Sequence, residues 1–371
     1  MSNPLNTRIT DLLGCKYPII QTAMGWVADP TLVAGTCNAG GFGFLAGATI
    51  PPEEMERDIL RVKELTDKPF GVNFHMYQPN AAEIVDLVIK HGVRAVSYSR
   101  SPGPEFIKKL KDANVVCMPT VGLPKHAIKA VELGADAVTV QGGEGGGHTG
   151  SVPTTLLLPQ VVDAVGDKVP VLGAGGFKDG RGLLAAMSYG ADGIAMGTRF
   201  LLTKESPVPE ATKARYIDCK NPGEIVVSTA MDGLPQRMIM NKVLRELESA
   251  SALKKLIIAL RNGLAFRKFT GASLFGLLKS AMAMTKSGDL TLAQAIMSAN
   301  APMIIQKAMV DGQPDEGVLP SGQVAGVIDQ LLSCEELITQ IVAEAEAGLQ
   351  RFSVGASSAR ESSSAGQTPT A

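Results

Sequence analysis

The sequence has little that would tie it to a membrane or a nucleic acid. It holds no uninterrupted apolar run of roughly 18 residues, and its opening MSNPLNTRITDLLG has no stretch suited to a signal peptide. Lys and Arg number 35 against 36 Asp and Glu, so the formal net charge of −1 gives no overall attraction to nucleic acid. We therefore expect a cytoplasmic protein without nucleic-acid or membrane partners.

Cysteine is also scarce, and its spacing disfavours two kinds of site. The five cysteines are scattered and form no CxxC pair. We expect buried free thiols in a reducing compartment rather than a disulfide framework. We also expect no metal site, because no pair of His, Cys or carboxylate residues has the spacing of metal ligands. The cysteines are Cys15, Cys37, Cys117, Cys219 and Cys334.

Residues 17–200 instead contain a repeated alternation of short apolar runs and amphipathic stretches. PEEMERDILRVKEL, AAEIVDLVIKHG and PKHAIKAVELG carry apolar residues at helical spacing. Eight such units predict a parallel sheet closed into a (β/α)8 TIM barrel, whereas the competing doubly wound sheet usually has about five or six strands. The expected strands are residues 17–24, 42–47, 70–75, 95–100, 115–121, 137–142, 169–176 and 193–200.

Glycine and polar residues gather where these expected strands end, in QTAMG, NFH, QGGEGGGH, GAGG and GTRF. The carboxyl ends of barrel strands form the active-site face, so we expect one shared ligand site. Glycine amides after the last two strands are typical of a phosphate site. The alternative is that these glycines only cap helices. The expected phosphate donors are Gly175, Gly176, Gly197 and Thr198.

Residues 141–150, QGGEGGGHTG, surround one histidine with six glycines. Glycine permits positive φ and close approach to a ligand, at a cost of up to about 1 kcal/mol in regular structure. An imidazole, with an ordinary pKa of about 6.5, can take or give a proton near cellular pH. We predict that His148 is an acid–base group, with a capping role in a tight loop as the alternative. Gly145, Gly147 and Gly150 match G-x-G-x-x-G, a weak signal because no helix pattern follows.

After about residue 205 the sequence becomes loop-like and then basic. Residues 235–286 carry ten Lys or Arg against two Glu, a local charge of +8. We expect a helical lid here, in which Arg261, Arg267 and Lys268 bind substrate or cofactor phosphates, or else a solvated helix face. The expected divisions are a barrel at 1–214, a basic helical insertion at 215–316, a helical segment at 317–352 that returns to the barrel, and a disordered tail at 353–371.

Three further residues are candidates for substrate contact. Trp26 follows the AMG motif directly and either flanks the substrate or packs in the core. Ser321 and Gln323, with Gly322 between them in GVLPSGQVAG, either enter the site from the C-terminal segment or form a plain helix N-cap at Ser321.

The motifs QTAMGWV, GVNFH, QGGEGGGHTG, GAGGFKDGRG and AMGTRF together resemble the nitronate monooxygenase (2-nitropropane dioxygenase) family in order and spacing, over about residues 5–352. The resemblance implies an FMN-binding (β/α)8 barrel with an inserted smaller, mainly helical second domain. The family also includes flavin enoyl-thioester reductases and NAD(P)H:quinone reductases. Among its branches, the chain looks closest to bacterial members linked with the breakdown of coenzyme A-bound ring compounds.

By position, the resemblance makes His148 the family's active-site histidine. Two positions depart from the pattern of some relatives: Thr120 stands where they carry Lys, and Gln141 where they are acidic. These departures leave the substrate class open. The implied FMN contacts are Ala23, Met24, Gly25, Asn73, His75, Gln141, Gly147, Ala174, Gly175, Gly176, Gly197 and Thr198.

The first functional hypothesis is therefore FMN-dependent oxidation of a nitronate with O2, with His148 as acid or base. The alternative is an FMN-dependent enoyl reductase or dehydrogenase that acts on a coenzyme A thioester with NAD(P)H. The third hypothesis is a barrel that binds a phosphorylated ligand without redox chemistry, such as an isomerase. The sequence leaves open the substrate, the electron acceptor and whether the chain forms a homo-oligomer.

Overall fold

Eight parallel strands close into a barrel in the order β1-β2-β3-β4-β5-β6-β8-β9, with β1 paired to β9. The computed structural model describes residues 4–47, 50–75, 78, 80–99, 103–251, 257–258 and 300–364. All eight expected strands are confirmed, and the closed barrel excludes the doubly wound alternative. The strands are β1 (Ile19–Gln21), β2 (Phe42–Ala46), β3 (Gly71–His75), β4 (Ala95–Ser99), β5 (Val116–Val121), β6 (Val138–Gln141), β8 (Val171–Ala174) and β9 (Gly193–Met196).

Helices connect successive strands and surround the barrel. Four of them, α2, α3, α5 and α6, begin with proline at a first-turn position, where the missing N–H has no helical partner to lose. Their apolar residues face the strands, as the sequence period predicts. The helices are α2 (Pro30–Asn38), α3 (Pro52–Leu65), α4 (Ala81–Lys90), α5 (Pro104–Asp112), α6 (Pro124–Glu132), α7 (Thr154–Val165), α8 (Gly180–Ser188) and the short α9 (Thr198–Leu201).

The amino end of the barrel is tied to the first helix. In α1 (Arg8–Leu13), the Arg8 guanidinium donates to both carboxylate oxygens of Asp192, over 2.8 and 2.7 Å. Asp192 stands directly before β9 and also accepts from the main-chain N–H of Val171, at the start of β8, over 3.0 Å. These contacts stabilise the end of the barrel opposite the carboxyl-terminal strand ends.

A second, smaller sheet of four antiparallel strands lies outside the barrel. It consists of β7 (Gly147–His148), β10 (Ile225–Ser228), β11 (Gln236–Ile239) and β12 (Leu319–Pro320). The strands β10 and β11 lie within residues 215–316, which the sequence describes as mainly helical without naming a strand. Each of these strands has four residues, too few for alternation to stand out, and the basic charge count over 235–286 does not reveal a strand.

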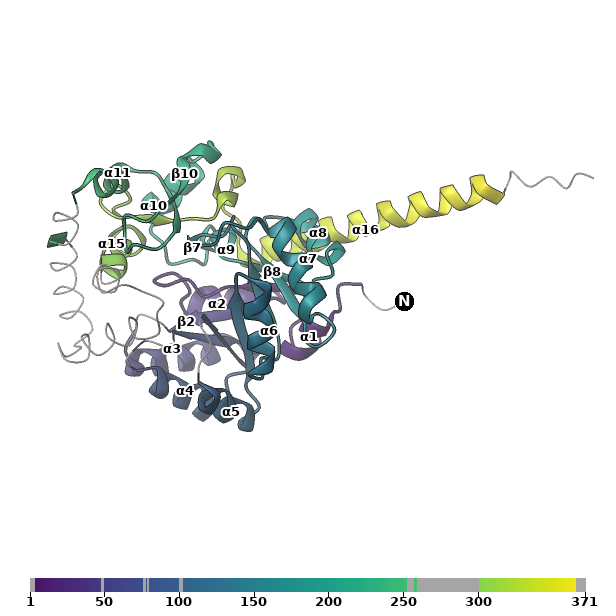
Figure 1. The fold of residues 1–371 in the computed structure, drawn as a ribbon, viewed down its shortest axis with the longest axis horizontal. Coiled ribbons are helices and arrows are strands. Elements are labelled where there is room, and N and C mark those ends of the chain that lie inside the picture. Colours follow the sequence, from purple (N-terminus) through teal and green to yellow (C-terminus); the bar gives the residue numbers. More distant parts are fainter. Residues whose placement is uncertain are drawn as a thin grey trace, which may run out of the picture.

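Three helices stand beside this sheet, on one side of the barrel (Figure 1). They are α10 (Glu210–Ile217), α11 (Lys242–Ser249) and α15 (Asn300–Met309). A separate apolar cluster, which includes Met231, Met238 and Leu244, joins β11 to α11 and α15. The sheet thus has an apolar cluster of its own, and it also joins the main core of the barrel through Ile225, Ile239 and Leu319.

The C-terminal helix α16 (Cys334–Ser364) packs against α8 and α2, and its last turns extend away from the barrel (Figure 1). The Glu344 carboxylate accepts from the main-chain N–H of Gly180 over 2.9 Å, at the start of α8. The sequence predicts a disordered tail from residue 353; the structure assigns residues 353–364 to α16, and the disorder of the tail stays a prediction. Residues 365–371 lie outside the described residues.

Two further expectations from the sequence concern the cysteines, expected to be free thiols, and the helices, expected not to span a membrane. All five cysteines are free, and four of them are buried, which confirms the expectation of free thiols. Burial raises the pKa of the Cys37 thiol to about 12. Within the described part of the chain, no helix combines the length and the apolar character needed to cross a membrane.

Candidate active site

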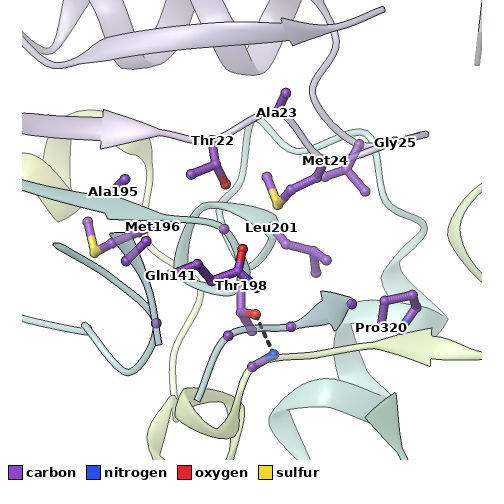
Figure 2. Close-up of a pocket in the computed structure, with 18 of the residues that line it drawn as sticks. Thr22, Ala23, Met24, Gly25, Gln141, Ala195, Met196, Thr198, Leu201 and Pro320 are labelled. Carbon is purple, nitrogen blue, oxygen red and sulfur yellow. Dashed lines mark hydrogen bonds between the residues drawn. The ribbon is translucent and has the colours of Figure 1, made fainter. Parts of the chain in front are cut away.

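A cavity of about 450 Å³ opens at the carboxyl ends of the barrel strands, a size suited to a small-molecule ligand (Figure 2). Its apolar inner wall comes from barrel side chains such as Ile20, Phe44 and Met196. A few amide and hydroxyl groups reach it from neighbouring strands; among them, Asn73 Nδ2 donates to Ser97 Oγ over 3.1 Å. An apolar chamber with few polar groups suits a flat aromatic ring that has polar edges.

Most of the sequence-predicted site residues line this one cavity. They arrive from five strand ends that are far apart in the sequence, as the barrel argument requires. The expectation of one shared ligand cavity therefore agrees with where these residues lie, while their individual roles remain proposals. The predicted residues that line it are Ala23, Met24, Gly25, Trp26, Asn73, Gln141, Gly147, His148, Ala174, Gly175, Gly176, Gly197 and Thr198.

The remaining predicted residues lie elsewhere. His75 ends β3 but does not line the cavity; its main-chain N–H donates to Gln78 Oε1 over 2.8 Å. Ser321 is fully buried, with its hydroxyl donating to the Gly322 carbonyl over 3.0 Å, and Gln323 lines a neighbouring surface hollow. Gly322, between them, is the residue of this segment that lines the cavity. Arg261, Arg267 and Lys268 lie outside the described residues.

Three glycines line the cavity at the ends of β8 and β9. Gly175 and Gly176 have φ of 96° and 82°, which favour glycine. A Cβ at Gly197 would lie 3.1 Å from Thr22 Oγ1 and 3.4 Å from Met24 Sδ. Main-chain amides at two adjacent strand ends are suited to a phosphate group. Together with the apolar chamber, these residues fit FMN, a flat ring with a phosphate tail.

The glycine-rich loop that follows β6 is crowded, and this crowding explains several of its glycines. A Cβ at Gly146 would lie 2.6 Å from the main-chain nitrogen of Gly322, and one at Gly145 would lie 2.6 Å from Gln141 Nε2. By contrast, a Cβ at Gly150 would meet no heavy atom within 4 Å. Glycine is therefore needed where the loop meets the C-terminal segment and β6.

Two charged residues hold this loop in place. The Glu144 carboxylate caps α7 by accepting from the Thr154 main-chain N–H over 2.9 Å and from its hydroxyl over 2.7 Å. The Arg237 guanidinium, from β11, donates to the Gly143 carbonyl over 3.0 and 2.7 Å. Burial lowers the pKa of Arg237, with the Glu144 charge opposing that shift. The loop is thus fixed to both a barrel helix and the small sheet.

His148 lies at the edge of the small sheet and faces the cavity. Its Nε2 is 2.8 Å from Asp232 Oδ2 and 3.1 Å from Gln236 Nε2. Its own carbonyl accepts from Gln141 Nε2 over 2.8 Å. The side chain is 58% exposed, whereas that of Asp232 is 3% exposed. The imidazole therefore combines access to the cavity with a buried carboxylate partner.

The sequence analysis did not identify three parts of the site: Asp232, Gln236 and an apolar wall of the cavity to which α15 contributes. The signal available for the first two was the Asp-Gly pair in IVVSTAMDGLPQRMI, a turn dipeptide between two β-prone runs. The wall consists of apolar residues of α15 and nearby segments that line the cavity. They are Ala301, Pro302, Ile305, Met309, Pro320 and Val324, and no local pattern assigns them to the site.

The fold and the cavity define a (β/α)8 barrel protein with glycine-rich strand ends and an imidazole around a single cavity. The family profile described as nitronate monooxygenase matches residues 6–344. The chain belongs to this family, which is one of FMN-dependent oxidoreductases, and it is accordingly an enzyme.

Named relatives fall into two groups. The chain is 50% identical, over 92% of its length and 96% of the relative, to the (3aS,4S,5R,7aS)-5-hydroxy-7a-methyl-1-oxo-octahydro-1H-indene-4-carboxyl-CoA dehydrogenase of Rhodococcus jostii. It is 34% identical, over 66% of its length and 81% of the relative, to a probable nitronate monooxygenase of Staphylococcus saprophyticus. Among solved structures, FabK from Thermotoga maritima is similar with a TM-score of 0.75 and 29% identity, covering 94% of this chain and 98% of FabK.

Proposed function

We propose that the chain is an FMN-dependent dehydrogenase or enoyl reductase that acts on the coenzyme A thioester of a ring compound. The observation that carries the proposal is the 50% identity, across nearly the whole of both chains, to a relative named as a dehydrogenase of a bicyclic carboxyl-CoA. The apolar wall formed by α15 residues such as Ile305 and Met309 supports it, because an alicyclic ring would bury apolar surface there.

The chemistry follows from the acidity of the carbon next to a thioester. Removal of hydrogen across the Cα–Cβ bond takes a proton from Cα and a hydride from Cβ. In this proposal His148 holds the Cα proton, since a neutral imidazole accepts protons near neutral pH. FMN, when bound, supplies the hydride acceptor. The reverse direction, enoyl reduction, returns the same proton from His148.

The remaining side chains in the cavity position the two ligands. We assign the phosphate of FMN to the glycine amides at Gly175, Gly176 and Gly197, with Thr198 beside them, and the ring to the chamber between Met24 and Asn73. A nicotinamide nucleotide, NAD(P)+ or NAD(P)H according to direction, is the proposed second redox partner. We also propose a cytoplasmic location, supported by the five free thiols.

Nitronate oxidation is a second candidate, favoured by the description of the matching family and by the relative of Staphylococcus saprophyticus. The carbon next to a nitro group is acidic for the same reason as the carbon next to a thioester, so His148 could serve either substrate. The apolar wall separates the two candidates, because a small nitronate would leave it largely uncovered.

Anaerobic reduction of the purified flavoprotein tests the proposal. The flavin absorbance is followed as cyclohexanecarboxyl-CoA, propionate 3-nitronate, NADH and NADPH are added in separate experiments. Bleaching by the acyl-CoA, or bleaching by NAD(P)H that an enoyl-CoA reverses, is the expected result. Bleaching by the nitronate alone would assign the protein to nitronate oxidation instead. A purified protein that binds no flavin would overturn both candidates.

A further inference from the structure

We infer that Asp232 and Gln236 fix the proton of the neutral His148 imidazole on Nε2, so that Nδ1 is the atom that exchanges protons with substrate. Both residues are then positioning residues, which act through His148 rather than on the reacting atoms. The tautomer itself is a property of the protein alone; only its role in catalysis rests on the proposed function.

The hydrogen-bond inventory of Asp232 carries the inference. Its Oδ1 accepts from the main-chain N–H of Leu234 over 3.0 Å, and its Oδ2 lies 2.5 Å from Gln236 Nε2 and 2.8 Å from His148 Nε2. A carboxylate accepts hydrogen bonds and has none to donate. Each of these three nitrogens must therefore supply the hydrogen, and His148 can do so only with its proton on Nε2.

The competing tautomer is costly in this geometry. If the proton stood on Nδ1, the lone pair of His148 Nε2 would face Asp232 Oδ2 at 2.8 Å with no hydrogen between them. Asp232 is 2% exposed, so water could not relieve that repulsion. The 3.1 Å pair of Gln236 Nε2 and His148 Nε2 is a hydrogen bond only in the competing tautomer, where the second amide hydrogen of Gln236 can point at the Nε2 lone pair. With the proton on Nε2, both nitrogens instead donate to Asp232 Oδ2.

The small sheet holds the three residues in place. In the antiparallel pairing of β7 with β11, His148 lies directly opposite Gln236, and Gly147 opposite Arg237. Asp232 occupies the turn before β11, and Gln236 is 2% exposed, so its amide has little freedom to leave the carboxylate. The backbone register thus brings the carboxylate to the edge of the ring that faces away from solvent.

The same arrangement of carboxylate, imidazole and reacting proton operates in serine proteases, where replacement of the carboxylate by an amide favours the wrong tautomer and lowers kcat by about 10⁴. Asp232→Asn should act similarly, because the new amide N–H can face Nε2 and stabilise a proton on Nδ1. We expect kcat to fall roughly 10²- to 10⁴-fold with KM little changed.

The direct test is a long-range ¹H–¹⁵N correlation spectrum of the FMN-loaded protein with ¹⁵N-labelled histidine rings. The chain has four histidines, and the His148→Gln variant identifies the His148 signals by their loss. Above the titration of the ring, we expect wild-type His148 to show the Nε2–H pattern. An Nδ1–H pattern, or an even mixture of the two tautomers, in the wild-type protein overturns the inference without recourse to any variant.

Asp232→Asn should then shift the His148 signals toward the Nδ1–H pattern. Asp232→Glu keeps a carboxylate, so it should retain more of the Nε2–H pattern and more activity than Asp232→Asn. The matched control is Asp192→Asn. Asp192 is likewise a buried carboxylate with several N–H donors, but it lies at the opposite end of the barrel. It should lose stability and keep the Nε2–H pattern; a tautomer shift in the control as well would show a global effect and refute the specific role of Asp232.

The result of the tautomer test can be distinguished from the result of the test of the proposed function. An Nε2–H tautomer in a protein that turns over no acyl-CoA would retain the inference and refute the proposed substrate. Acyl-CoA turnover with an unchanged tautomer and unchanged kcat in Asp232→Asn would retain the substrate and refute the inference.

Discussion

The main-chain N–H of Gly322 donates a hydrogen bond to Thr198 Oγ1 over 2.9 Å, across a sequence separation of 124 residues (Figure 2). The bond joins the end of β9 to the C-terminal segment and lies beside the proposed phosphate site. It shows why the segment 321–323 matters to the cavity although the Ser321 and Gln323 side chains do not line it: the contribution comes from the main chain at Gly322.

Thr198→Val should weaken FMN binding by about tenfold and lower the melting temperature, because the Gly322 N–H loses its acceptor while the shape of the side chain is kept. Thr198→Ser is the matched control, since it keeps the hydroxyl and should bind FMN as the wild type does. Fluorescence titration of apoprotein with FMN measures the affinity. Equal affinity in all three proteins would contradict a role for this hydroxyl.

His148→Ala should keep FMN bound and reduce turnover roughly 10²- to 10⁴-fold, because the variant loses the proton acceptor and not the cofactor site. The control is His126→Ala, which removes an exposed imidazole of α6. Steady-state kinetics and the bound flavin spectrum are the measurements. Full activity in His148→Ala would remove this residue from the mechanism.

Gly146→Ala should destabilise the protein by about 1–3 kcal/mol, because its Cβ would meet main-chain atoms of Ser321 and Gly322 at 2.7 and 2.6 Å. Gly150→Ala, in the same loop, adds a methyl group with no heavy atom within 4 Å and should stay within about 0.5 kcal/mol of the wild type. Urea unfolding followed by circular dichroism gives both values. Equal effects in the two variants would show that loop crowding does not limit stability.

Asp58 should make the protein less stable as the pH rises from about 4 to 6. Partial burial, together with the smaller effects of the Glu54 and Asp29 charges, raises the pKa of this carboxyl to about 6. The folded state then binds more protons than the unfolded state between an ordinary aspartate pKa of about 4 and the raised value, so the free energy of unfolding falls across that window.

Asp58→Asn should accordingly flatten this slope and raise the free energy of unfolding at pH 7 by on the order of 1 kcal/mol, a figure reduced to allow for solvent screening of the half-buried group. Urea unfolding at a series of pH values is the measurement. Asp163→Asn, on the exposed side of α7, should leave the slope as it is. An unchanged slope in Asp58→Asn would contradict the raised pKa.

The basic segment outside the described residues provides a test of the coenzyme A proposal. Replacement of Arg261, Arg267 and Lys268 together by Ala should raise KM for an acyl-CoA about tenfold or more, because these cations are proposed to bind its phosphates. The corresponding N-acetylcysteamine thioester lacks those phosphates and should show an unchanged KM. The same KM for the acyl-CoA in variant and wild type would refute the lid.

Much of the barrel and of its active-site face can be predicted from the sequence, because both depend on short-range patterns. Strands and helices of βα units are set by apolar spacing over about ten residues, and the order of the units places strand ends together. This reasoning predicted Gly175, Gly197 and His148 at one shared site, and all three line the cavity. The sheet made by β7, β10, β11 and β12 could not be predicted from the sequence. Its strands have only two to four residues, and some of them pair with strands that are far away in the sequence.

What the sequence by itself determined is therefore the barrel, the glycine-rich strand ends and the histidine that they surround. What only the tertiary structure decided is the environment of that histidine. Asp232 stands 84 residues from His148, and the hydrogen bond between them exists because β7 pairs with β11. No local pattern encodes that partner: a side-chain contact between distant segments depends on the packing of the whole chain, whereas a strand or a helix depends on its own neighbours.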